Sequence, residues 1–286
     1  MTEAPTGVAA AIDPLVTRVL AGNPSPYTFT GTQTYLVGTA DLAVIDPGPD
    51  EPAHLEALRA AIAGRPVTAI VCTHTHRDHS PAAAPLKGRD RRADHRLRGA
   101  VAERRRPARR RRVRPHLCAR SRPRRRRDAV GRGVDARGGR DPPGHTSNHL
   151  CYALRETGAL FSGDHVMGWS TTVVAPPDGD MADYMASLDK LLARDDRVYY
   201  PAHGPEIDRP RRFVRGLIGH RRQREGQILR LLGQDVREVP AMVARMYVGL
   251  DPRLIGAAGR SVLAHLIDLR ARGLVTGDGD DWRMAA

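Results

Sequence analysis

A run of metal-binding residue types follows the apolar stretch 67–72, and it restricts the possible folds more than any other part of the chain. The run reads Thr73-His74-Thr75-His76-Arg77-Asp78-His79. Side chains two residues apart on an extended chain point to the same side, so His74 and His76 can bind one ion together. A tight turn would then aim Asp78 and His79 at a second position. The pattern predicts a two-metal site at the end of a buried strand.

Three later residues have the same chemistry and are each bordered by glycine, which permits the close turns that ligand loops need. They are His145 in Pro-Gly-His-Thr, Asp164 in Ser-Gly-Asp-His and His203 in Ala-His-Gly. Each of them alone is more often a surface or core residue than a ligand. Combined with the first run, they predict seven metal ligands, namely His74, His76, Asp78, His79, His145, Asp164 and His203. We assign no metal role to His149 or His165.

Strand and helix patterns alternate around these residues. Residues 33–46 have a hairpin pattern, 54–63 and 181–192 have helical patterns, and 67–72, 150–154, 159–161 and 197–200 have strand patterns. This order predicts α/β layers. Helical patterns at 213–232, 236–248 and 259–272, followed by a hairpin pattern at 274–284, predict a winged-helix-like module. We expect two domains, 1–210 and 211–286, and we favour a packing role for the second over contact with nucleic acid or substrate.

The basic charge of the chain is confined to one segment. The formal net charge of +14 would ordinarily indicate a nucleic-acid partner. Residues 88–141, however, contain 22 arginines, no lysine and six acidic residues, whereas the other 232 residues carry 24 basic and 26 acidic groups. Outside this segment the charge gives no reason to expect binding to nucleic acid.

Segment 88–141 also has too few apolar side chains to form a core. It contains six Val or Leu residues and no Ile, Met, Phe, Trp or Tyr, which is too little to offset the entropy lost on ordering. A basic nucleic-acid arm and a disordered insert are two interpretations. We favour a third, in which two compensating frameshifts in GC-rich DNA produced this arginine-rich stretch. We therefore expect 88–141 to be disordered or non-native.

Several motifs resemble the metallo-β-lactamase superfamily. They are Asn23-Pro24-Ser25-Pro26-Tyr27-Thr28, Gly31-Thr32-Gln33-Thr34-Tyr35-Leu36-Val37, Ile45-Asp46-Pro47-Gly48 and the run from Thr73 to His79. The tail, with His220-Arg221-Arg222-Gln223-Arg224-Glu225 and Ala264-His265-Leu266, is similar to the β-lactamase-like protein 2 branch, whose members carry a C-terminal winged-helix-like domain. The resemblance covers residues 1–87 and 142–286 and is absent across the arginine-rich segment.

The resemblance implies an α/β fold, an αββα sandwich, with a defined ligand set. His74, His76 and His145 would bind the first metal, Asp78, His79 and His203 would bind the second, and Asp164 would bridge the two. Asp46 would brace the loop from Thr73 to His79, called the motif loop below, without binding metal itself. We expect two divalent ions, with zinc the commonest occupant of such residues, although manganese and iron also suit mixed nitrogen and oxygen ligands.

The expected reaction is hydrolysis. Two divalent ions about 3.5 to 4 Å apart can hold a bridging water, lower its pKa and present hydroxide to an electrophile. Asp78 is the expected catalytic residue, because a carboxylate beside the water can orient it and later pass on its proton. Our first hypothesis is a hydrolase acting on a small-molecule ester, thioester or lactam.

Two other functions stay open. The resemblance includes endoribonucleases acting on single-stranded RNA, and a positive, aromatic-lined groove would favour that activity. The near-neutral charge outside 88–141 and the aromatic content of 4% weaken it. Alternatively, the chain is an inactive product of a frameshifted coding sequence, because the strand expected to deliver His145 reads Val-Asp-Ala-Arg-Gly-Gly-Arg-Asp-Pro and cannot bury a face.

The remaining features indicate a soluble, cytoplasmic protein. No apolar run reaches the roughly 18 residues of a membrane helix, and the first residues lack a secretory signal pattern. The three cysteines, Cys72, Cys118 and Cys151, show neither a disulfide framework nor a zinc-site spacing. We expect a small-molecule substrate and no membrane partner, with nucleic acid as the second choice.

The frameshift hypothesis makes a direct prediction about the coding DNA. Translation of codons 87 to 142 in the other two frames should reveal a sequence with the apolar periodicity of core strands and helices. Comparison of the three translations checks this. If neither alternative frame yields such periodicity, the hypothesis is wrong and the arginine-rich segment is native.

Overall fold

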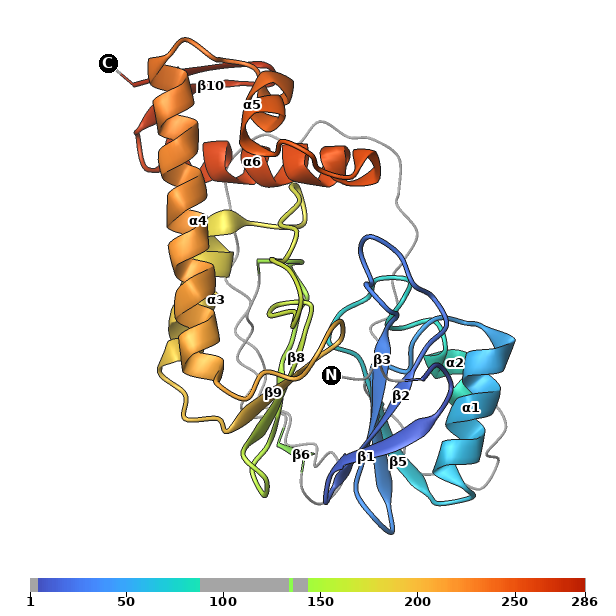
Figure 1. The fold of residues 1–286 in the computed structure, drawn as a ribbon. Helices are drawn as coiled ribbons and strands as arrows, with labels where there is room; N and C mark the ends of the chain where they lie inside the picture. The colour runs from blue at the N-terminus through green and yellow to red at the C-terminus, as the bar shows by residue number, and fades with distance from the viewer. Residues whose placement is uncertain (1–4, 88–133, 136–143, 286) are drawn as a thin grey trace, which may run out of the picture.

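The computed structural model describes residues 5–87, 134–135 and 144–285. The prediction that 88–141 is disordered or non-native lies outside the described residues, apart from the two residues of one short strand. The described residues form two sheets, helices on their outer faces and a C-terminal module (Figure 1).

The two sheets hold the candidate ligands at the ends of their strands. The first sheet has the order β1 (Ala9–Asp13), β2 (Val16–Leu20), β3 (Gln33–Val37), β4 (Leu42–Ile45) and β5 (Val67–Val71). The second has the order β6 (Val134–Asp135), β7 (Tyr152–Leu154), β8 (Ala159–Gly163) and β9 (Val198–Pro201). Strands β4 and β5 pair in parallel, as do β8 and β9, and the other neighbours are antiparallel.

Alternating side chains place each sheet between two apolar layers. In β3 and β4 one set of residues, including Leu36 and Val44, packs with Ile62 of α1 (Pro52–Ile62) on the outer face. The intervening residues, including Tyr35, face the second sheet, where Phe161 is a neighbour at a ring-centroid distance of 5.1 Å. This period-two alternation is what a strand buried on both faces requires. A short helix, α2 (Ala83–Lys87), follows the motif loop.

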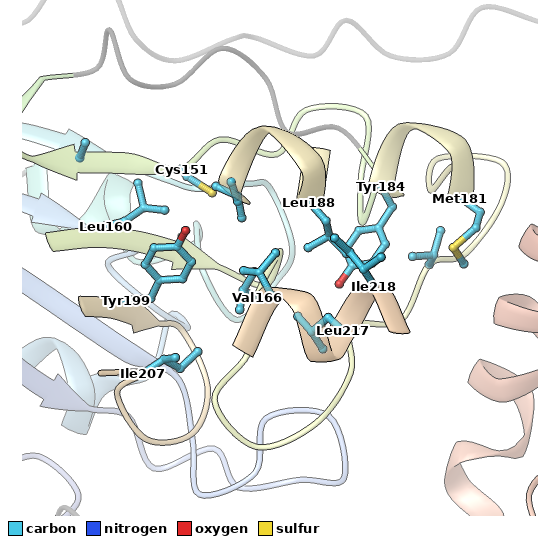
Figure 2. Close-up of a cluster of buried hydrophobic side chains, with 14 of the residues drawn as sticks. Cys151, Leu160, Val166, Met181, Tyr184, Leu188, Tyr199, Ile207, Leu217 and Ile218 are labelled. Carbon is cyan, nitrogen blue, oxygen red and sulfur yellow. The ribbon is translucent and has the colours of Figure 1, made fainter. Parts of the chain in front are cut away.

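Helices α3 (Met181–Leu192) and α4 (Pro210–Gly233) cover the outer face of the second sheet. Figure 2 shows Leu160 and Tyr199 of the sheet beside Leu188 of α3 and Leu217 of α4 in one buried cluster. Helix α3 begins where the side chain of Asp180 accepts a hydrogen bond from the Asp183 amide at 2.9 Å, a favourable N-cap. The order of layers is helix, sheet, sheet, helix, as the αββα prediction requires.

The C-terminal module has its own core. It comprises the end of α4, α5 (Val239–Met246), the short helix η2 (Pro252–Leu254), α6 (Ile255–Ala271) and the hairpin β10 (Val275–Asp278) and β11 (Asp281–Met284). Trp282 and Val262 are buried there with Ile228 of α4, whereas Leu217 of α4 belongs to the sandwich core. Because α4 contributes to both cores, the division at residue 210 stays a prediction.

The sequence patterns locate most elements but do not predict strands β1 and β2 or the short helices α2 and η2. β1 and β2 carry no clear alternation in the sequence, and β1 is partly exposed at the edge of its sheet, so its pairing depends on β2 rather than on its own side chains. In the region expected to precede His145, β6 pairs Val134 with Leu154 and Asp135 with Ala153. Among the helices of the described ranges, none combines the length and apolar character that a membrane crossing requires.

Candidate metal centre

Four strands deliver polar residues to one edge of the sandwich. Asp46 follows β4, His74 lies three residues beyond β5, Asp164 follows β8 and His203 lies two residues beyond β9. Because β4 pairs in parallel with β5, and β8 with β9, the carboxyl ends of each pair lie together. The two sheets meet here as well, since Gln33 donates its backbone amide to the carbonyl of Ala202 at 2.8 Å.

All seven residues predicted as ligands gather at this edge in two groups. In each group, the donor atoms lie within 4.8 Å of one another. The first group contains His74, His76, His145 and Asp164, and the second contains Asp78, His79 and His203. Within the first group, His76 Nδ1 lies 2.8 Å from His74 Nε2 and 3.3 Å from His145 Nε2.

The carboxylate of Asp164 lies between the two groups. Its Oδ2 is 3.6 Å from Nε2 of His145 and 3.9 Å from Nε2 of His74, both in the first group. Its Oδ1 is 3.2 Å from Nε2 of His203 and 3.4 Å from Nε2 of His79, both in the second. Each oxygen therefore faces a different set of nitrogens, which is the arrangement of a bridging carboxylate.

Four imidazoles are oriented by a hydrogen bond at the ring nitrogen that points away from the cluster. The pairs are His74 Nδ1 with Thr73 Oγ1 at 3.1 Å, His79 Nδ1 with Asp46 Oδ2 at 3.1 Å, His145 Nδ1 with the Val173 carbonyl at 2.7 Å and His203 Nδ1 with the Gly31 carbonyl at 3.2 Å. A ring that donates from Nδ1 presents the lone pair of Nε2 to the cluster. Such fixed tautomers are typical of metal-binding histidines.

Asp46 stabilises the motif loop, as the sequence analysis predicts. Its Oδ1 accepts the Thr73 amide at 2.6 Å, and its Oδ2 accepts the Thr73 hydroxyl at 2.8 Å and His79 Nδ1 at 3.1 Å. The residue is 2% exposed, so these bonds form away from competing water. One carboxylate thus fixes the chain before His74 and the ring of His79.

Unpaired buried atoms test whether this cluster fits metal ions. His79 Nε2 and Asp164 Oδ1 are buried without a hydrogen-bond partner, although buried polar atoms are ordinarily satisfied. Burial lowers the pKa of His203, but the negative charge of Asp164, 3.2 Å away, and the close contact with Asp78 raise it to about 9. The carboxylates beside the second donor group therefore favour positive charge there, whereas burial lowers the pKa of His74 and His145 in the first group. Imidazole and carboxylate donors of this kind suit a dimetal centre.

His149 has a supporting role that the sequence analysis does not identify. Its Nε2 accepts the backbone amide of Asp164 at 3.1 Å, and its ring is buried 5.0 Å from that of His74. Gly163 permits this contact, because a Cβ at its φ of +53° would lie 2.7 Å from His149 Nε2 and 2.6 Å from Thr73 Oγ1. His149 belongs to neither donor group, so it holds the Asp164 loop rather than an ion.

A cleft of about 470 Å³ lies between the sandwich and the C-terminal module. Phe29 and Trp169 line it with stacked rings whose centroids are 4.9 Å apart, and Leu254 of the C-terminal module adds a further apolar side chain. Arg253 also lines the cleft, but its charge is offset by Asp251, with 2.7 Å between Nη2 and Oδ2. The lining is therefore largely apolar and close to neutral.

Backbone contacts connect this aromatic wall to the His203 loop. Gly168, which precedes Trp169, donates its amide to the carbonyl of His203 at 2.9 Å. A Cβ at Gly204 would lie 2.9 Å from the backbone nitrogen of Trp169, so only glycine allows this approach. Gly31, whose carbonyl accepts from His203, lies two residues after Phe29. The backbone that carries Phe29 and Trp169 is therefore hydrogen-bonded to the loop that carries His203 of the second donor group.

Comparison with known proteins places both parts of the chain in described families. The model of the metallo-beta-lactamase superfamily matches residues 27–203. The model of the beta-lactamase associated winged helix domain matches residues 239–282. The first match alone spans more than half of the chain and contains every residue of the two donor groups.

Curated relatives match at about one third identity. Beta-lactamase-like protein 2 homologs of Caenorhabditis elegans and Drosophila melanogaster are 34% and 33% identical to the chain, over 79% and 90% of its length and 74% and 88% of their own. An atrochrysone carboxyl ACP thioesterase of Aspergillus fumigatus is 32% identical over 79% of this chain and 68% of its own length.

Solved structures share the fold. A metallo-beta-lactamase family protein from Thermus thermophilus has a TM-score of 0.70 at 21% identity, covering 96% of this chain and all of its own. A beta-lactamase domain protein from Burkholderia ambifaria has a TM-score of 0.73 at 21% identity, covering 99% and 95%. At 21% identity the likeness shows the fold alone, namely the arrangement of the sandwich and the C-terminal module.

The bonds of Asp46 make a prediction about metal affinity. Asp46→Asn replaces one acceptor oxygen by an NH₂ group that faces the donors Thr73 Oγ1 and His79 Nδ1, so His79 loses its orientation. We expect affinity for divalent ions to fall about 10- to 100-fold, measured by competition with a chromophoric chelator. Asp50→Asn, at an exposed position four residues on, is the control and should leave affinity unchanged. Equal affinity in both variants would contradict the role of Asp46.

Proposed function

The chain belongs to the metallo-beta-lactamase superfamily, and from this premise we propose that it hydrolyses a small-molecule ester, thioester or lactam at a centre of two divalent ions. The fold is that of a metal-dependent hydrolase with a C-terminal winged helix domain. The observation that carries the proposal is the position of Asp164, whose two oxygens face two separate sets of imidazole nitrogens.

In this proposal seven residues hold the two ions. His74, His76 and His145 would hold the first, Asp78, His79 and His203 the second, and Asp164 both. When bound, two divalent ions lower the pKa of a shared water towards neutrality and polarise the bond under attack. We propose zinc, because five imidazoles and two carboxylates match its usual ligands; manganese and iron also suit such donors.

Asp78 is the residue that we propose to move the proton. Its Oδ2 lies 3.2 Å from Nε2 of both His79 and His203, and Thr32 donates to the same oxygen at 3.3 Å. Burial opposes its ionisation, but the close contacts with the imidazoles of His203 and His79 hold the pKa of Asp78 well below its ordinary value. Its side chain is 26% exposed, against 11% for Asp164. A carboxylate so placed can orient a water and take up its proton.

The cleft supports a small apolar substrate. Phe29 and Trp169 offer a flat wall whose backbone is tied to the His203 loop, and such rings favour a planar or unsaturated acyl group. Among the similar proteins are an ACP thioesterase and proteins named lactamase-like, whose names are consistent with carbonyl substrates of this kind. We therefore place a thioester first among the candidate bonds.

Cleavage of single-stranded RNA is the second candidate, and the stacked aromatic pair favours it, because bases stack on such rings. The charge of the cleft does not favour RNA, since its Arg253 is paired with Asp251.

Inactivity is the third candidate. The described residues retain the complete donor set, including His145 directly after the arginine-rich region, which supports metal binding by the chain as written.

A substrate panel tests the proposal. The zinc-loaded full-length chain should hydrolyse an aromatic acyl thioester faster than a chromogenic lactam and leave single-stranded RNA intact. Asp164→Asn should lower kcat/KM by at least about 100-fold, because the bridging carboxylate is lost. Asp189→Asn, on the exposed face of α3, should retain full activity. RNA cleavage without thioester turnover would establish the second candidate instead.

A further inference from the structure

Thr172 and Val173 each form a hydrogen bond with one residue of the first donor group. The carbonyl of Val173 accepts His145 Nδ1 at 2.7 Å. The neighbouring hydroxyl of Thr172 donates to the carbonyl of Asp164 at 2.6 Å. Thr172 is buried, with 2% of its surface exposed. Segment 172–173 thus acts as a strap, and any shift of it would move a candidate ligand on each side.

One buried arginine fastens this strap to the helical layer. Arg221 of α4 is 3% exposed and donates from Nη2 to the carbonyl of Thr172. Its guanidinium also lies 5.2 Å from the centre of the Tyr184 ring. The hydroxyl of Tyr184 donates to the carbonyl of His165 at 3.1 Å, the residue after Asp164. Arg221 therefore supports the Asp164 loop from two sides.

The stability of the fold does not explain why a charged side chain is buried at position 221. Within the described residues it forms no ion pair, and its Nε is buried without a hydrogen-bond partner. Burying a guanidinium without a carboxylate is costly, and an apolar side chain of similar length would ordinarily serve the fold as well or better. What Arg221 supplies and an apolar residue cannot is the bond to the strap.

The position of Arg221 also connects the C-terminal module to the metal centre. The residues of α4 before it, Leu217 and Ile218, pack in the sandwich core, and Ile228 after it packs in the module. From α6, His265 is buried with both ring nitrogens unpaired; burial and the charge of Arg221 lower its pKa to about 3. Because a neutral imidazole carries no positive charge, His265 does not repel the buried guanidinium of Arg221.

We propose that Arg221 is a positioning residue that, through strap 172–173, sets His145 and Asp164 in place for the first ion and couples α4 to the metal centre. The proposal gives Arg221, one residue of the His220 to Glu225 motif, a role that the hydrolytic chemistry does not assign to it. The inference rests on the proposed metal centre, since it concerns how that centre is held.

Arg221→Met tests the inference, because methionine keeps the apolar stem and removes the donor. Stepwise zinc titration of the full-length chain should show at least one of the two binding steps weakened about 10-fold or more, while the urea midpoint of the metal-free chain does not fall. Arg221→Lys, which keeps a charge and a donor, should recover part of the loss. Arg222→Met, at the exposed neighbouring position, should bind both ions as the unmodified chain does.

The outcomes separate this inference from the proposed function. Two ions bound by the unmodified chain and by Arg221→Met with equal affinities would overturn the positioning role alone. No ion bound by the unmodified chain would overturn the metal centre and the inference with it. If Arg221→Met does not fold, Thr172→Val decides: it removes the bond to Asp164, and a weakened step would support the strap whereas unchanged affinities would refute it.

Discussion

The meeting of two parallel strand pairs at one edge of the sandwich is the constraint on which the metal centre depends. The carboxyl ends of β4 and β5 and of β8 and β9 lie together there, so residues far apart in the chain reach a common point without long loops. Gln33 ties the sheets at the same edge, its side chain donating to the carbonyl of Pro201 at 3.3 Å. The position of the site is thus a consequence of strand topology rather than of any single loop.

Burial of so many donors in a small volume has a cost that a cation would remove. Asp164 Oδ1 and His79 Nε2 are both buried without a hydrogen-bond partner. Unpaired buried polar atoms destabilise a fold. Outer contacts prevent the cluster from relaxing: Asp46 holds His79 and Thr73, and His149 holds the Asp164 amide. Prearranged donors of this kind bind metal tightly because little ordering remains to be done on binding.

The sequence locates the candidate ligands better than it locates the residues that hold them in place. His74, His76, Asp78 and His79 lie within six residues, and glycine marks the later three, so local spacing is sufficient. Arg221 reaches a carbonyl 49 positions away, and His149 reaches Asp164 only because Gly163 lacks a side chain; no local pattern encodes either contact. The cleft likewise depends on the meeting of loop 24–29 with η2, which sequence periodicity does not reveal.

Metal content tests the central claim most directly. The full-length chain, purified, exchanged into chelator-treated buffer and reloaded with zinc, should retain about two ions per chain by inductively coupled plasma mass spectrometry, as the two donor groups predict. Asp164→Asn should retain fewer, because both groups share that carboxylate. A chain that folds and retains no ion would contradict the account.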